Sequence, residues 1–287
     1  MSNLAILLED RGILSIGGNE WRDFLQNLIT NDVDLLSADR AIYSALLTPQ
    51  GKYLYDFLLV QAGDSLLVDV HATQLPEFLK KLMMYRLRAD ATLEDASSQW
   101  AVYALLGDVP SLGNELGACL NIGGGVVYRD PRTVKLGARA ILPVDDASEI
   151  ISSLGFLSAG RPDYEAHRIG LGVVDGVQDL EEERTLLLEA NFEVLHGIAF
   201  NKGCYVGQEQ TARTKHRATI RNRLYPVAFD GAAPESGTTV SANNKDIGTI
   251  RSVSGMQGIA RLRVETVEDG APLTAGDTKL TVKELEL

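Results

Sequence analysis

Cysteine is scarce in this sequence of 287 residues, which contains only Cys119 and Cys204. Two thiols are too few for a disulfide framework, or for a site in which four cysteines hold a metal ion or a cluster. The four histidines are scattered, and no two of them have the i, i+4 spacing of a helical pair of metal ligands. We therefore expect no bound metal.

Long apolar runs are also missing. Stretches such as Trp100–Leu106 fall far short of the roughly 18 to 20 apolar residues that span a bilayer. Near the start of the chain, Glu9, Asp10 and Arg11 occupy positions where a secretory signal needs an uninterrupted apolar stretch. These absences predict no transmembrane helix and a cytoplasmic location.

An excess of basic residues is missing as well, since 39 Asp and Glu outnumber 27 Lys and Arg, for a net charge of −12. General nucleic-acid binding needs a broad basic face that neutralises phosphates, so this class of function is disfavoured. What the chain does have is 45% hydrophobic residues. That content and the length predict an ordinary globular protein of two or three compact units.

The spacing of apolar residues changes repeatedly between strand-like and helix-like in the first three quarters of the chain. It predicts strands at residues 12–16, 41–47, 53–60, 65–70, 100–106, 125–128 and 138–142. Helices are expected at 21–29, around 75–82, at 147–154 and from 161 onward. The Pro and Gly of Thr48–Lys52 predict a hairpin turn. The predicted fold class is therefore α+β.

From Tyr225 onward the pattern changes to short runs of Val, Ile and Leu that glycines interrupt at short intervals. Short apolar strands separated by glycine-containing turns are typical of a small barrel or sandwich. We place a domain boundary near Arg221, which divides the chain into residues 1–220 and 221–287.

The segment around Cys204 has the composition of a ligand-binding loop that leads into a helix. Gly203 and Gly207 allow a ligand to approach the backbone closely. Residues 208–217 favour a helix, in which Glu209 and Arg213 form a supporting i, i+4 pair. A helix N-terminus attracts anions and favours a thiolate, although a lone cysteine is more often a small buried apolar residue.

The same segment is locally basic. Residues 202–223 carry a charge of +5, which leaves −17 for the remainder of the chain. The basic residues are Lys202, Arg213, Lys215, Arg217, Arg221 and Arg223, against Glu209 alone. Such a cluster suits an anionic partner, such as a carboxylate-bearing cofactor or a phosphate; the alternative is a helix face that is merely solvated.

The run Lys202-Gly203-Cys204-Tyr205-Val206-Gly207-Gln208-Glu209 resembles the signature of the YgfZ family. Residues 24–32, 47–52 and 188–191 also look like segments of that family, so the resemblance covers most of the chain. It implies a fold similar to that of the glycine-cleavage T-protein, with three domains around a central folate channel. The first two domains would interleave, roughly as 1–45 plus 155–220 and as 46–154, before a C-terminal β-barrel at 221–287.

The resemblance also implies a function: binding of tetrahydrofolate, and assembly or repair of iron-sulfur clusters in enzymes that include those modifying tRNA. The expected partners are folate and iron-sulfur enzymes or assembly proteins. Cys204 is the predicted catalytic residue, and Glu189 is similar to a family position that faces the folate pterin. The predicted cofactor-binding residues are Glu189, Lys202, Gly203, Tyr205, Gly207, Gln208, Glu209 and Arg213.

Alternatives remain open at this point. Where the T-protein carries an aspartate that acts on folate, we align Gln74–Phe78, in which Glu77 is the nearest acid. This departure weakens the reading as a folate-dependent aminomethyl or one-carbon transferase. A third reading is an RNA or protein interaction module that uses residues 202–223. The sequence does not decide whether any reaction turns over. It also does not decide whether the Cys204 thiol guards against oxidation, accepts sulfur or touches a cluster held by a partner.

Overall fold

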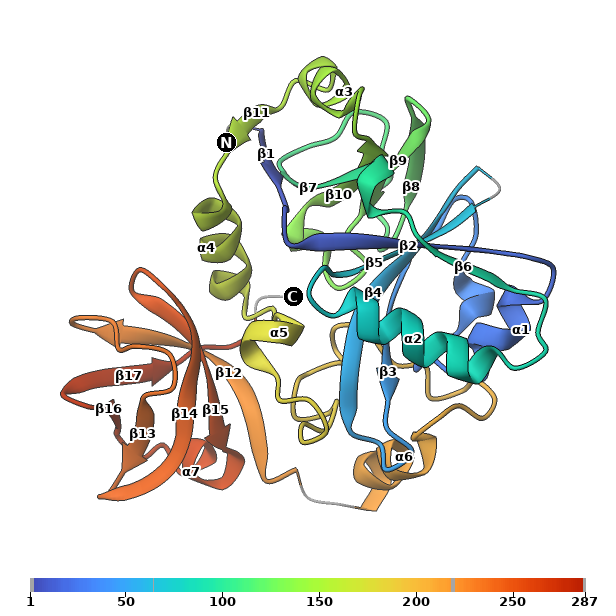
Figure 1. The fold of residues 1–287 in the computed structure, drawn as a ribbon. Helices are drawn as coiled ribbons and strands as arrows, with labels where there is room; N and C mark the ends of the chain where they lie inside the picture. Colours follow the sequence, from blue (N-terminus) through green and yellow to red (C-terminus); the bar gives the residue numbers. More distant parts are fainter. Residues whose placement is uncertain (1–2, 64, 218–219, 286–287) are drawn as a thin grey trace.

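Two β-sheets, their flanking helices and a closed β-barrel organise the chain (Figure 1). The computed structural model describes residues 3–63, 65–217 and 220–285, apart from the side chains of His216 and Arg217. The barrel stands beside the two sheets, and helix α4 (Arg161–Leu171) runs from the first sheet towards it (Figure 1).

Sheet one has six strands, and only its outermost pair, β11 with β1, is parallel. In spatial order its strands are β11 (Leu157–Ala159), β1 (Leu4–Leu7), β7 (Trp100–Leu106), β10 (Ala138–Pro143), β9 (Gly125–Arg129) and β8 (Cys119–Ile122). Sheet two is antiparallel, in the order β3 (Ile42–Leu47), β4 (Tyr53–Ala62), β5 (Ser65–His71), β2 (Arg11–Gly17) and β6 (Thr92–Asp95).

The two sheets stack face to face because their strands are apolar on the facing sides. In β3, Tyr43 and Ala45 belong to the core that also contains Val102 and Ile141 of sheet one. The alternate residues Ile42 and Leu46 belong to a second core on the opposite face. Successive side chains of a strand point to opposite faces of the sheet. A strand that is buried on both faces is therefore apolar at nearly every position, as residues 41–47 are.

Helices cover the outer face of each sheet, which gives four layers. Helices α1 (Trp21–Gln26) and α2 (Leu75–Arg86) pack on the outside of sheet two through Phe24 and Phe78. Helix α3 (Ala147–Ser153) covers the outside of sheet one through Ile150. The other helices are α5 (Gly176–Asp179), α6 (Gln208–Arg217), α7 (Val264–Glu268) and three short 3-10 helices at Val33–Leu35, Ser97–Gln99 and Val134–Leu136.

The C-terminal residues form a six-stranded barrel with its own core. Its strands, in order around the barrel, are β12 (Asn222–Asp230), β15 (Gln257–Arg263), β14 (Lys245–Ser254), β13 (Thr239–Ala242), β16 (Leu273–Ala275) and β17 (Thr278–Val282), which pairs back onto β12. Closure leaves no free sheet edge in the barrel. The predicted change of pattern near Arg221 therefore lies next to the start of the first barrel strand.

The predicted α+β class and C-terminal barrel are confirmed. The helix predicted at 21–29 is too long: it ends at Gln26, and Ile29 instead forms a β-bridge with Leu46. The interleaving of two subdomains stays a prediction. Sheet one takes its strands from residues 4–7 and 100–159, and sheet two takes its strands from residues 11–95.

Candidate functional site

Three of the segments that carry the family resemblance meet around Cys204. Nζ of Lys202 donates hydrogen bonds to the carbonyl oxygens of Ile29, at 2.9 Å, and Asn31, at 2.7 Å. Gly207 packs against the Thr48 carbonyl oxygen, which would lie 2.7 Å from a Cβ at position 207. Residues 202–207, which we call the thiol loop, are thus held at both ends against segments that flank β3.

The two cysteines have opposite surroundings. Cys204 is exposed, and among the described residues its thiol makes no hydrogen bond. The neighbouring Gly203 has no atom within 4 Å of the place where a Cβ would be, so the loop is open to solvent here. Cys119 is half-buried, and burial raises the pKa of its thiol to about 12. Because thiolates are the reactive and ligating form, Cys204 is the accessible candidate and Cys119 is inert.

Lys202 points inward from the thiol loop. Burial lowers the pKa of its ammonium to about 8, and the nearby carboxylates of Asp32 and Asp34 oppose this shift. Its charge also lies 5.3 Å from the centroid of the Tyr205 ring. Both hydrogen-bond acceptors are backbone carbonyls, so two of the three N–H groups of the ammonium serve the conformation of the loop, and the part of Lys202 in cofactor binding stays a prediction.

The remaining predicted cofactor residues differ in their surroundings: some make contacts within the protein, Gly203 and Glu209 are exposed, and Glu189 lies apart. Tyr205 is buried, Gln208 donates to the Gly203 carbonyl at 3.3 Å, Arg213 donates to Gln210 at 2.8 Å, and Glu209 is exposed. Glu189 lies towards the barrel, where its carboxylate is 3.5 Å from Arg261. The structure brings the residues from 202 to 213 together, but it does not bring Glu189 to them in one described cavity.

The basic cluster also separates into parts. Lys215 forms an ion pair with Glu193 at 2.9 Å, and Arg223 lies on the first barrel strand with Arg221 directly before it. The side chain of Arg217, which belongs to the basic segment, and that of its neighbour His216 lie outside the described residues. Two of the basic residues, Lys202 and Lys215, are therefore engaged in contacts within the protein.

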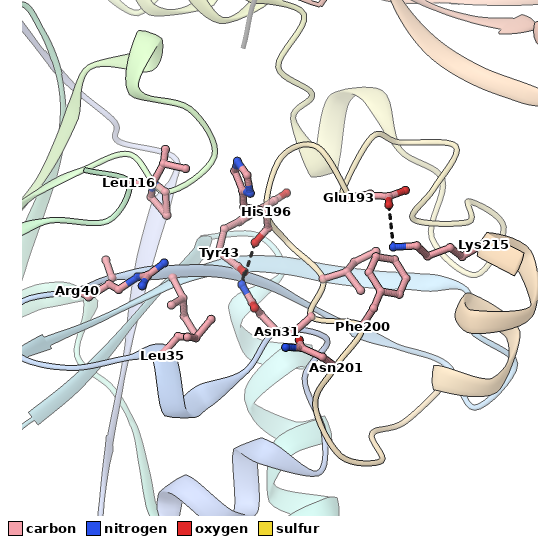
Figure 2. Close-up of a pocket in the computed structure, with 15 residues that line it drawn as sticks. Asn31, Leu35, Arg40, Tyr43, Leu116, Glu193, His196, Phe200, Asn201 and Lys215 are labelled. Carbon is pink, nitrogen blue, oxygen red and sulfur yellow. Dashed lines mark hydrogen bonds and ion pairs between the residues drawn. The ribbon is translucent and has the colours of Figure 1, made fainter. Parts of the chain in front are cut away.

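A pocket of about 560 Å³ lies beside the thiol loop (Figure 2). Its walls come from the segment before β3, from β3 itself, from the loop at 193–201 and from α6, with a contribution from the sheet-one region. The lining residues are Asn31, Leu35, Arg40, Ala41, Ile42, Tyr43, Leu116, Pro131, Glu193, His196, Ile198, Ala199, Phe200, Asn201 and Lys215. Apolar walls with a few converging polar groups are typical of a small-molecule site.

The polar groups of the pocket are held by a buried asparagine. The Asn31 amide donates to the carbonyl oxygens of Tyr43, at 2.7 Å, and of His196, at 2.8 Å. His196 has a φ of 56°, a left-handed conformation that is uncommon outside glycine and recurs at binding sites. Burial and the charge of Arg40 lower the pKa of His196, which favours the neutral imidazole.

Between the two sheets and α4 lies a network of buried charges. The Asp69 carboxylate accepts from Arg11 on β2 and, at 2.8 Å, from Arg139 on β10, so it ties the two sheets together. Arg132 and Arg139 both also contact Asp130. The space among these side chains is only about 10 Å³. That is about the volume that one water needs, and no cofactor fits there.

The buried acids of this network were missed in the sequence, and Asp56 is one of them. Asp56 on β4 accepts hydrogen bonds from the Tyr53 hydroxyl, at 2.7 Å, and the Tyr43 hydroxyl, at 3.0 Å. The signal was a single acid inside an otherwise apolar strand. Glu77, the nearest acid of the aligned segment, is instead exposed and pairs with Lys80 at 3.3 Å.

Comparison with solved structures defines the class of fold. Glycine cleavage system aminomethyltransferase T from Bartonella henselae aligns with a TM-score of 0.81 at 16% identity, over 99% of this chain and 86% of that one. This protein therefore has the aminomethyltransferase T fold. Residues 221–286 match the family model of the CAF17 C-terminal β-barrel domain.

Sequence comparison gives the family. Iron-sulfur cluster assembly factor IBA57 of Mus musculus is 33% identical, over 95% of this chain and 81% of its own length. The Homo sapiens protein of the same name is also 33% identical, over 94% of this chain and 80% of its own length. The chain belongs to the IBA57 family of iron-sulfur cluster assembly factors. The YgfZ resemblance thus named a related family, and the particular family is IBA57.

The predicted cytoplasmic location is wrong, because the names of these relatives place them in mitochondria. Composition carries no reliable signal for an organelle, which explains the error. None of the described helices is long and apolar enough to cross a membrane. Among the described residues there is also no group of three or more His, Cys, Asp or Glu side chains placed to hold a metal ion.

Proposed function

We propose that this protein supports iron-sulfur cluster assembly by presenting the Cys204 thiolate to a cluster that a partner protein holds. The observation that carries this proposal is an exposed thiol on a loop that is anchored at both ends. Iron-sulfur clusters are held by cysteine thiolates, and four are usually needed. One exposed thiol can supply a single ligand, so the partner supplies the others. A mitochondrial location and tRNA-modifying enzymes among the clients belong to this proposal.

Replacing Cys204 with serine tests it. In a strain that lacks the native protein, Cys204→Ser is expected to lower the recovered activity of iron-sulfur enzymes at least about tenfold, because serine does not replace a thiolate ligand. Cys119→Ser is the matched control and is expected to behave like the native protein, since that thiol is half-buried with a high pKa. Full activity with Cys204→Ser under oxidative stress would contradict the proposal.

Tetrahydrofolate binding is a second candidate, and the pocket beside the thiol loop favours it. Its volume of about 560 Å³ lies within the range of about 300–1,000 Å³ that is typical of small-molecule sites. Ile42 offers an apolar wall to a flat ring, as does the face of Phe200 that the Lys215 ammonium does not cover. The Glu193 carboxylate pairs with Lys215 at 2.9 Å and has further acceptor positions for an aminopyrimidine edge. Arg40 forms no ion pair among the described residues and is available for the glutamate tail.

Calorimetric titration of tetrahydrofolate tests this candidate. We expect saturable binding that Glu193→Ala weakens about tenfold, because one charge-assisted pair of hydrogen bonds is lost. Equal weakening by Glu189→Ala instead would place the pterin at the barrel side, as the sequence predicted. Glu77→Ala is the matched control on an exposed acid. No binding at sub-millimolar folate would remove folate from the function.

The two other readings have less support. Aminomethyl transfer needs an acid that can exchange a proton with the folate, yet Asp56 is absent from the pocket lining and is held by two tyrosine hydroxyls. The acid that does line the pocket, Glu193, is paired with the Lys215 ammonium. RNA binding needs a continuous basic face, whereas Lys202 points inward and Lys215 is paired with Glu193.

A further inference from the structure

Lys202 is half-buried, and both of its hydrogen-bond partners are backbone atoms. Its Nζ atom reaches two carbonyl oxygens that lie more than 170 residues earlier in the chain, those of Ile29 and Asn31. Among the described residues no carboxylate lies within ion-pair distance of it. Asp32 and Asp34 act on this ammonium only from a distance, so its two hydrogen bonds to backbone carbonyls are the contacts that hold it in place.

The far end of the thiol loop is held independently. The Gly207 carbonyl accepts from the Thr211 hydroxyl at 3.2 Å, which joins it to the first turn of α6. The Gln208 amide donates to the Tyr205 carbonyl at 3.2 Å, and the Tyr205 side chain is buried. Only Gly203 and Cys204 lie exposed between the Lys202 anchor and this second anchor. The conformational mobility of Cys204 therefore depends on how stable the contacts are at the two ends of the thiol loop.

We propose that Lys202 is a positioning residue for Cys204: its two hydrogen bonds to Ile29 and Asn31 hold the N-terminal side of the thiol loop in the conformation that a partner's cluster meets. This inference rests on the proposed role of the thiol. The protonated amine has three N-H groups and the neutral amine has two, so either form can satisfy both carbonyls. A loop that is already ordered loses less entropy when a partner binds, which favours docking.

Positioning differs from thiol chemistry in what a variant changes. Lys202→Met keeps the length of the side chain but leaves both carbonyls without their donor. We expect amide hydrogen exchange at residues 203–206 to become about tenfold faster, while exchange in the two sheets stays the same. Alkylation of Cys204 by iodoacetamide, measured in a Cys119→Ser background, is expected to change less than about twofold because the thiol is exposed already.

Cluster assembly is then expected to fall about tenfold in Lys202→Met although the thiol reacts normally, and Lys202→Arg, which keeps donors, is expected to recover part of it. Lys80→Met, on an exposed lysine of α2, is the matched control. If Lys202→Met does not fold, Lys202→Leu replaces it, because leucine also lacks a donor. Native assembly by either variant, or faster exchange throughout the protein, would overturn the inference. A different pair of results separates the two proposals. If Lys202→Met speeds exchange only in the thiol loop while Cys204→Ser keeps full activity, Lys202 does anchor the loop but the proposed function of the thiol is wrong.

Discussion

Replacing Arg168 with methionine is expected to lower the free energy of unfolding by about 3–5 kcal/mol, the typical cost of removing one partner from a buried ion pair. The Arg168 guanidinium is fully buried and lies 3.0 Å from the Asp179 carboxylate, which loses its cation in the variant. It also donates to the Ser252 hydroxyl, at 2.9 Å, on barrel strand β14. One side chain thus connects α4, α5 and the barrel.

Urea unfolding followed by circular dichroism measures this effect. The matched control is Arg184→Met, because Arg184 is 81% exposed and its contact with Glu181 is loose at 3.5 Å. Exposed pairs of this kind contribute about 0–1 kcal/mol. The contacts that dock the barrel are expected to lose the most stability in Arg168→Met. We therefore also expect residues 221–287 to unfold in a separate transition at a lower urea concentration. Equal stability of the two variants would contradict this assignment.

Gly207→Ala is expected to lower the free energy of unfolding by about 2–4 kcal/mol, because backbone strain and overpacking add. Gly207 has a φ of 82°, and an added Cβ would lie 2.7 Å from the Thr48 carbonyl oxygen and 2.9 Å from Cα of Gly51. Both obstacles are backbone atoms, which cannot rotate away. The far anchor of the thiol loop is displaced as a result, so cluster assembly is also expected to fall.

Gly155→Ala separates the two causes. Gly155 has a similar φ of 79°, but no atom lies within 4 Å of the place where its Cβ would be. Its replacement is expected to cost only the left-handed conformation, about 1–2 kcal/mol. Thermal or urea unfolding of both variants gives the comparison. If Gly207→Ala is as stable as Gly155→Ala, the turn at Thr48 moves to make room for the added Cβ, and the prediction is wrong.

Local patterns predicted the elements that depend on local interactions. Strand β7 at Trp100–Leu106 and helix α6 at Gln208–Arg217 were predicted with the bounds that the structure has. The hairpin of β3 and β4 was also correct, because Pro49 and Gly51 mark the turn between two apolar runs. These signals depend on residues a few positions apart, which a single sequence displays directly.

Elements held by distant partners were predicted less well. The helical spacing of Leu28 and Ile29 continued that of α1, yet the Thr30 amide donates to the Ala45 carbonyl, so tertiary pairing ends the helix early. Strand β1 was not predicted, since its four residues are stabilised by pairing with β7 and β11, about 100 and 150 residues later. Likewise, no local signal linked Arg40 with His196 in one pocket.

The sequence by itself determined the α+β class, the C-terminal barrel and the glycine-flanked loop that carries Cys204, since these depend on composition, periodicity and an unbroken motif, whereas the role of Cys204 stays a prediction. Only the tertiary structure decided that Lys202 turns inward, that Glu189 faces Arg261, and that a pocket forms beside the thiol loop. The reason is physical: a polar side chain takes the partner that folding brings within about 3 Å, and the chain order does not record which partner that is.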